Sequence, residues 1–98
     1  MEGRINLTVE FYGTSRQAAD TSQMKIEISS DNSVLWSDIT STLLERLPGL
    51  AGKVIEVGSG CLASSYAINL NGGHFINQEN TVFKDGDVLI IVPSMAGG

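Results

Sequence analysis

The stretch from Thr81 to Pro93, TVFKDGDVLIIVP, contains the most hydrophobic run of the chain. Its residues 84–87, KDGD, place two carboxylates around a glycine, which is typical of a tight turn. The apolar residues Val88–Val92 follow without polar alternation, and such a run predicts a central strand that is buried on both faces. Pro93 has no N–H to donate, so we expect strand pairing to end there.

Two further strands are predicted near the N-terminus. In residues 5–11, apolar Ile5, Leu7, Val9 and Phe11 alternate with polar side chains, the pattern of a half-buried strand. Residues 24–28 repeat this alternation after GTSRQAADTSQ, a polar loop with room for one helical turn. We therefore expect these two strands to pair.

The period changes to that of a helix over Val34–Leu47. Apolar residues recur there at spacings of three and four and form one stripe; they are Leu35 or Trp36, Ile39, Leu43 and Leu47. Ser33 is a suitable N-cap, and Pro48-Gly49 ends the helix.

The middle of the chain is less regular. Residues 50–63 contain Gly58-Ser59-Gly60, and we expect a loop or a short strand. Tyr66, Ile68 and Leu70 alternate with smaller or polar residues and predict a strand. Asn71-Gly72-Gly73 then turns the chain, and Phe75-Ile76 begins a return strand.

These elements predict a single α+β domain, because 98 residues suffice for one core. The two N-terminal strands form a hairpin, one main helix covers one face, and the last strand returns to the centre of the sheet. We expect a mixed sheet of about five strands.

Composition and charge limit the classes of function. The net charge is −5 and the six basic residues are scattered, so a nucleic-acid interface is not expected. No apolar run is long enough to cross a membrane, and the N-terminus lacks a signal-peptide pattern. The single Cys61 excludes an internal disulfide. We expect a cytoplasmic protein.

The chain ends on SMAGG, residues 94–98. Glycine loses the most backbone freedom on folding, so Gly97-Gly98 is a poor end for a core but suits a thin tip that enters a narrow channel. No side chain after Asp87 is charged. We therefore divide the chain into a folded domain, residues 1–93, and a flexible tail, residues 94–98.

Together these motifs resemble the MoaD/ThiS family of ubiquitin-like sulfur carrier proteins, which have the β-grasp fold. The family pattern is an Asn-Gly hairpin, a turn of the Asp-Gly-Asp kind, a hydrophobic strand, a proline and a terminal Gly-Gly. This chain has Asn71-Gly72, Asp85–Asp87, Val88–Val92, Pro93 and Gly97-Gly98 in that order. The N-terminal VEFYGTSRQAA, with Arg16, resembles the first strand and loop of the family. The added residues 50–63 favour the type of the molybdopterin synthase small subunit.

The resemblance implies chemistry at the carboxylate of Gly98. A free carboxylate is a poor acyl donor, and adenylation supplies a good leaving group. A persulfide sulfur then displaces AMP and leaves a C-terminal thiocarboxylate, which donates sulfur in molybdopterin (molybdenum cofactor) biosynthesis. The residues that the resemblance implies in tail recognition are Pro93, Ser94, Met95, Ala96 and Gly97.

The implied partners are an E1-like adenylyltransferase of the MoeB/ThiF type, the large subunit of molybdopterin synthase and a persulfide sulfur donor. The chain contains no Gly-x-x-x-x-Gly-Lys-Ser/Thr loop, so we expect it to bind no cofactor or metal itself. ATP and magnesium belong to the activating enzyme. The chain is thus a carrier, and is not an enzyme on its own.

Three alternatives remain open at this point. The chain could be a ubiquitin-like modifier that is conjugated to lysines through Gly98. It could carry sulfur for thiamine, cysteine or tungsten-pterin assembly. It could also be a β-grasp binding module whose terminal glycines are incidental.

The remaining candidate residues have simpler interpretations. Phe75 belongs either to the core or to a partner interface on the exposed sheet face. Cys61 is interpreted as a small buried hydrophobe and Trp36 as helix packing. We expect His74 to be an exposed turn residue, and Asp85 and Asp87 to serve the turn rather than a metal.

Overall fold

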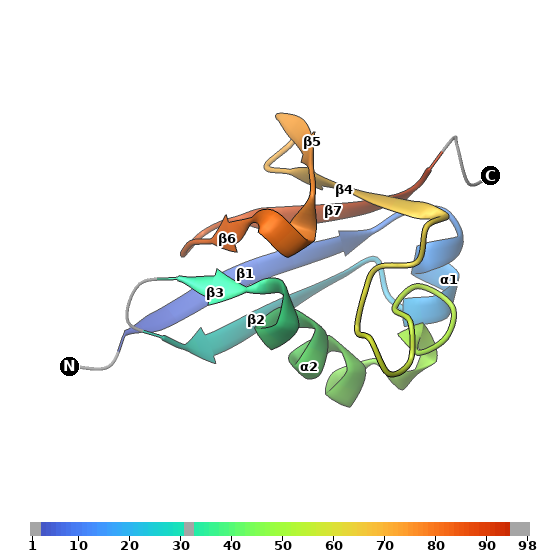
Figure 1. Ribbon diagram of the computed structural model, residues 1–98, viewed down its shortest axis with the longest axis horizontal. Coiled ribbons are helices and arrows are strands. Elements are labelled where there is room, and N and C mark those ends of the chain that lie inside the picture. Colours follow the sequence, from blue (N-terminus) through green and yellow to red (C-terminus); the bar gives the residue numbers. More distant parts are fainter. Residues whose placement is uncertain (1–2, 31–32, 95–98) are drawn as a thin grey trace.

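The computed structural model describes residues 3–30 and 33–94 of the chain. Its elements, shown in Figure 1, are β1 (Arg4–Phe11), α1 (Thr14–Ala19), β2 (Gln23–Ser29), β3 (Val34–Leu35), α2 (Trp36–Arg46), the 3-10 helix η1 (Pro48–Leu50), β4 (Tyr66–Leu70), β5 (His74–Ile76), the 3-10 helix η2 (Gln78–Asn80), β6 (Val82–Phe83) and β7 (Val88–Pro93).

Five of the strands form one mixed sheet, in the order β2-β1-β7-β4-β5. The N-terminal strands β1 and β2 pair antiparallel, with Leu7 opposite Ile26, which confirms the predicted hairpin. The last strand, β7, lies between β1 and β4 and is parallel to β1. The prediction that Val88–Val92 forms the central strand is therefore confirmed.

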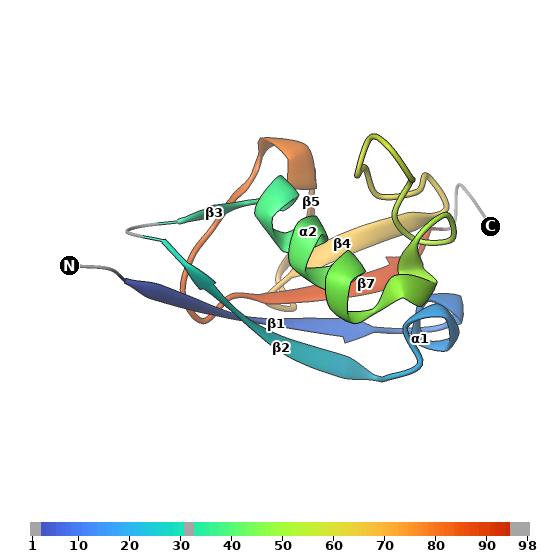
Figure 2. The same ribbon diagram turned by 90° about the horizontal axis from the view of Figure 1, so that it is seen from below.

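The prediction that this strand is buried on both faces is wrong. Leu89 and Ile91 are fully buried, whereas Val88, Ile90 and Val92 are only half-buried. The reason is visible in Figure 2, where α2 lies over one face of the sheet and no described helix covers the other. Side chains alternate between the faces of a strand, so every second residue of β7 points to the uncovered face.

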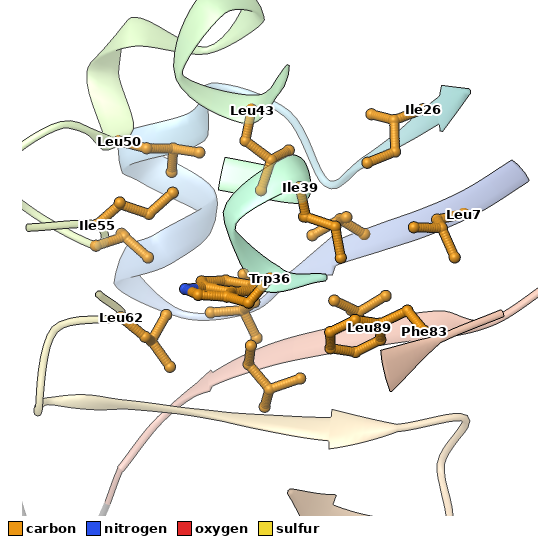
Figure 3. Close-up of a cluster of buried hydrophobic side chains, with 14 of the residues drawn as sticks. Leu7, Ile26, Trp36, Ile39, Leu43, Leu50, Ile55, Leu62, Phe83 and Leu89 are labelled. Carbon is orange, nitrogen blue, oxygen red and sulfur yellow. The ribbon is translucent and has the colours of Figure 1, made fainter. Parts of the chain in front are cut away.

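The core lies between the sheet and α2, and Figure 3 shows part of it. Trp36, Ile39 and Leu43 of α2 are buried, as their spacing predicts. They pack against the inner residues of the sheet, and the whole cluster comprises Ile5, Leu7, Val9, Phe11, Ala19, Ile26, Val34, Trp36, Ile39, Leu43, Leu50, Val54, Ile55, Leu62, Ile68, Phe83, Leu89 and Ile91.

The start of the helix differs from the prediction. Residues Val34 and Leu35 form the short strand β3, which pairs with β6, and the helix begins only at Trp36. Ser33 is therefore not the N-cap. Asp38, in the first turn, accepts the backbone N–H of Leu35 at 3.1 Å instead, so a carboxylate at the third helical position satisfies one of the free donors. Pairing of Val34 with Phe83 removes the residues before Trp36 from the helix.

Residues 51–63 are irregular, as expected. They contain only isolated bridges, from Ile55 to Ala51 and to Leu62. This segment nevertheless contributes Val54, Ile55 and Leu62 to the core. It closes the end of the α2 layer that lies beside α1 (Figure 1).

Candidate functional site at the base of the C-terminal tail

The structure describes only the beginning of the predicted site. Pro93, Ser94 and Phe75 lie within the described residues. Met95–Gly98, which include the predicted reacting group, lie outside them. The site is therefore built here from the end of β7 and the side chains around it.

The strand pairing of β7 ends at Pro93, as predicted. Pro93 is the last residue of β7 and lies opposite Tyr66 of β4. The N–H of Ser94 then donates to the carbonyl oxygen of Ser65 at 2.7 Å. Successive N–H groups of a strand point to opposite sides, so the missing donor of Pro93 faces β1, whose pairing with β7 ends at Phe11 and Ile91. The expectation that pairing ends at Pro93 is therefore confirmed, and the proline removes no hydrogen bond to β4.

Pro93 also touches the loop between β1 and α1. A Cβ added to Gly13 would lie 2.8 Å from Cγ of Pro93, and the φ of Gly13 is +62°. Both the contact and the left-handed backbone favour glycine. Sequence reasoning did not single out Gly13, although a glycine directly after a predicted strand was a signal that could have drawn attention to it.

Phe75 is on the surface, with 62% of its side chain exposed, so the core interpretation is excluded. It lies on β5 at one edge of the sheet, opposite Asn69 of β4. Together with four residues next to the tail it lines a surface groove, which we call the tail-base groove; its residues are Ala67, Phe75, Val92, Pro93 and Ser94.

The uncovered sheet face continues the tail-base groove inward. The strand registers align Glu10, Ile90, Asn69 and Phe75 in one row across β1, β7, β4 and β5. The Asn69 side-chain oxygen is buried and has no hydrogen-bond partner among the described residues. A half-buried apolar centre with one acceptor in it is a composition suited to a protein partner.

A polar cluster of Glu10, Tyr12 and Arg16 lies at the end of β1, on the opposite side of β7 from β4. Tyr12 donates its hydroxyl to Glu10 at 2.8 Å, and the Arg16 guanidinium lies 5.3 Å from the centre of the Tyr12 ring. The hydrogen bond to the Glu10 carboxylate, and then its charge, raise the pKa of Tyr12 above its usual value of 10.0, while Arg16 opposes this. The Arg16 Nε donates to the Phe11 carbonyl at 3.1 Å, which fixes the arginine beside this loop.

The other candidate residues have structural roles. Trp36 is buried and donates its indole N–H to the Gly60 carbonyl at 3.0 Å, which confirms helix packing. Cys61 is only half-buried, so its interpretation as a buried hydrophobe is wrong. His74 is exposed as expected, but it begins β5 rather than lying in the turn.

The two turn carboxylates hold the turn before β7. Asp85 accepts the backbone N–H of Asn6 at 2.7 Å. Asp87 accepts the N–H of Lys84 at 2.9 Å and the side-chain amide of Asn71 at 3.1 Å. Within residues 3–30 and 33–94 no group of three metal-ligating side chains occurs. In the same part of the chain, no helix has the length and apolar character to cross a membrane.

Comparison with known proteins gives consistent results along the whole chain. No protein-family model matches it. A curated relative, the molybdopterin synthase sulfur carrier subunit of Drosophila erecta, is 28% identical over 95 residues, which cover 96% of this chain and 92% of the relative. The relatives from Drosophila ananassae and Drosophila yakuba have the same name and are 27% and 28% identical.

Two solved structures represent the structural neighbours. The complex of subunits 1 and 2 of molybdopterin-converting factor from Helicobacter pylori matches with 26% identity and a TM-score of 0.56, over 96% of this chain and 100% of the matched chain. Small archaeal modifier protein 1 from Methanosarcina acetivorans matches with 24% identity and a TM-score of 0.69, over 98% and 99%.

The sheet order, the one helix that covers the sheet in the described part of the chain, and these neighbours define a ubiquitin-like β-grasp protein, as predicted. The full-length similarity to the curated sulfur carrier subunits confirms the more specific resemblance to the MoaD/ThiS family.

Proposed function

We propose that this chain is a sulfur carrier that is activated at the carboxylate of Gly98 and donates sulfur in molybdopterin biosynthesis, as the small subunit of molybdopterin synthase. The names of the Drosophila relatives and the Helicobacter pylori complex support this proposal. We further propose that it acts in the cytoplasm, as a carrier that performs no catalysis alone.

The main structural support for the proposal is that the base of the tail lies in a groove lined by apolar side chains. Ser94, the last described residue, is hydrogen-bonded to Ser65 and itself lines the tail-base groove with Phe75. A partner that binds this groove is therefore positioned next to the start of the tail. An extended chain from Pro93 to Gly98 spans roughly 20 Å, at about 3.3 Å per residue, and this length reaches a buried active site in that partner.

The proposed chemistry proceeds in three steps. The Gly98 carboxylate attacks the α-phosphate of ATP, and pyrophosphate leaves. The terminal sulfur of a persulfide then attacks the acyl carbon, and AMP leaves with the bonding electron pair. A second thiol of the sulfur donor cleaves the resulting acyl disulfide, which releases the thiocarboxylate of Gly98 and leaves the donor as a disulfide.

The partners supply everything that this chain lacks. We propose that an E1-like adenylyltransferase of the MoeB/ThiF type holds ATP and magnesium, that a persulfide protein supplies sulfur, and that the large subunit of molybdopterin synthase receives the loaded tail. In the tail, Met95 and Ala96 provide small apolar contacts. Gly97 and Gly98 allow the channel to close around the reacting carbon, because they carry no Cβ.

A second candidate function is supported by the archaeal neighbours, whose names describe them as modifier proteins. In this alternative the amine of a target lysine attacks the Gly98 adenylate, and an isopeptide bond forms. The intact mass of the protein purified from its native host distinguishes the two candidates. Replacement of one oxygen by sulfur indicates a carrier, whereas ladders of conjugates indicate a modifier.

Moving the terminal carboxylate by one residue tests whether activation at Gly98, which both candidate functions require, takes place. Deleting Gly98, or adding one residue after it, shifts the carboxylate by about 3.5 Å. A misplacement of about 1 Å can lower a rate on the order of a hundredfold. We expect both variants to melt like the parent chain and to form no acyl-adenylate with the cognate activating enzyme, measured by pyrophosphate exchange. Full thiocarboxylate formation by the untrimmed, extended chain would disprove activation at Gly98.

A further inference from the structure

Two parts of the fold that are distant in sequence meet around Pro93. On one side lies Gly13, in the loop between β1 and α1, in direct contact with the proline ring. On the other side lies Tyr66, its partner in the ladder with β4. Pro93 is therefore flanked by two elements just before the tail begins.

A side-chain hydrogen bond joins these two elements. The hydroxyls of Thr14, which follows Gly13, and Tyr66 are within hydrogen-bond distance although 52 residues separate them in the chain. Thr14 is exposed and Tyr66 is half-buried, so this hydrogen bond is not needed to pair polar groups that are buried in the core. An exposed hydrogen bond is worth little for stability, but it restricts the relative position of the groups that it joins.

The loop that carries Gly13 and Thr14 is itself fixed to β7. Ser15 is fully buried, and its hydroxyl donates to the Tyr12 carbonyl at 2.7 Å. The N–H of Tyr12 donates to the Ile91 carbonyl at 3.0 Å. These hydrogen bonds restrict movement of the loop away from the end of β7, and they thereby maintain its contact with Pro93.

We propose that Gly13, Thr14 and Tyr66 are positioning residues that set the direction in which the chain leaves the sheet after Pro93; we call them the tail guide. This inference rests on the proposed function, because direction matters only if a group on the tail must reach a defined place. The guide touches neither the reacting carbon nor a cofactor. It acts through Pro93 and through the hydrogen bond between Ser94 and Ser65.

A small change in backbone direction at Pro93 has a large effect at the end of the tail. A rotation at Pro93 displaces a tail of five residues by several times the displacement at its base, and reaction rates are sensitive to shifts of about 1 Å. Loss of the hydroxyl pair should therefore lower the rate of activation more than it lowers stability. Binding of the partner to the tail-base groove should be unchanged, because Thr14 and Tyr66 are not among the groove residues.

Four variants test the guide through acyl-adenylate formation with the activating enzyme, ATP and magnesium. Tyr66→Phe and Thr14→Val each remove one hydroxyl while preserving the shape of the side chain, and the double variant removes both. We expect kcat to fall about two- to tenfold in each, because even a shift of less than about 1 Å at the reacting carbon lowers the rate. KM should be unchanged, and the double variant should show no further loss, because both hydroxyls belong to one hydrogen bond. Thr14→Ser, which keeps the hydroxyl, should retain the parent rate. Multiplying losses in the double variant, or a rise in KM alone, would overturn the proposal.

Hydrogen exchange tests the guide without any activity. The amides of Ser94 and Asn71 are bonded to neighbouring strands near opposite ends of β7. Tyr66→Phe and Thr14→Val should accelerate exchange at Ser94 relative to Asn71, whereas global destabilisation accelerates both. Thr42→Val, which removes a hydroxyl bond on the exposed side of α2, is the matched control and should not change the ratio.

The kinetic assay and the exchange measurement distinguish failure of the tail guide from failure of the proposed function on which it rests. A parent chain that is never adenylated would refute the sulfur carrier, and the exchange ratio alone would then decide whether the guide exists. An unchanged ratio in both hydroxyl variants would refute the guide, whatever the activity.

Discussion

The N–H of Ser94 donates a 2.7 Å hydrogen bond to the carbonyl of Ser65, one residue beyond Pro93 and Tyr66, the last pair of the ladder between β7 and β4. Ser94, which the sequence analysis assigned to the tail, is thus hydrogen-bonded to the residue before β4. Ser94 is the last described residue, and it lines the same groove as Phe75. The proposed tail guide and the proposed docking surface therefore both lie around Pro93 and Ser94.

The central strand predicts a contrast between two neighbouring isoleucines. Ile91 is fully buried on the covered face of the sheet, whereas Ile90 is half-buried on the uncovered face. We expect Ile91→Ala to lower the free energy of unfolding by about 2–5 kcal/mol. Ile90→Ala should cost clearly less, because it leaves a smaller cavity. Urea unfolding of both variants measures the difference, and equal losses would mean that the sheet has no uncovered face.

Much of this sheet could be predicted from periodicity. The alternation in residues 5–11 and 24–28 gave the β1–β2 hairpin, and the unbroken run Val88–Val92 gave the central strand. The same run led to the wrong burial, because the residues on both faces of β7 are aliphatic and only the placement of α2 distinguishes the faces. A single-sequence pattern contains no information on that placement.

Contacts between distant residues account for the other differences. Val34 and Leu35 fall within the predicted helix, but pairing with Phe83 and Val82 holds them in β3. The candidate site was predictable as far as the tail itself, since its motifs lie in one segment. Gly13 and Tyr66 were not, because only the fold brings them to Pro93.

The turn before β7 should depend on Asp85. Its carboxylate accepts the Asn6 N–H at 2.7 Å and thereby joins the turn to β1. Asp85→Ala leaves that donor without its partner and should lower the free energy of unfolding by about 1 kcal/mol. Asp85→Asn preserves the accepting oxygen and should cost less. Thermal or urea unfolding distinguishes the two, and indistinguishable variants would contradict the role of this oxygen.

The pKa of Tyr12 gives a test of the polar cluster beside β1. Folded Tyr12 holds its proton more tightly than the unfolded chain does, since the Glu10 carboxylate accepts its hydroxyl. Its contribution to stability is therefore present below about pH 10 and is lost as the pH rises through the folded pKa. In a Tyr66→Phe background, ultraviolet titration follows Tyr12 alone. Glu10→Gln should lower the observed pKa, and an unchanged pKa would rule out Glu10 as its main cause.

The last prediction concerns the tail-base groove as a docking surface. With 62% of its side chain exposed, Phe75 contributes little to the core, so Phe75→Ala should lower the free energy of unfolding by less than about 1 kcal/mol. Exposed aromatic side chains at the centre of an interface often contribute about 2 kcal/mol or more to binding. We therefore expect Phe75→Ala to weaken binding to the large subunit of molybdopterin synthase about thirtyfold, since each 1.4 kcal/mol corresponds to about a factor of ten.

Val57→Ala is the matched control for this surface, because Val57 is an apolar residue with 75% exposure that lies in the irregular segment and not on the groove. It should leave the affinity unchanged. Calorimetry of the two variants against the large subunit compares them directly. An equal loss in both would indicate nonspecific contact of exposed apolar groups. Full affinity in Phe75→Ala would place the docking surface elsewhere on the fold. The partner would then bind a face other than the one on which Ser94 lies.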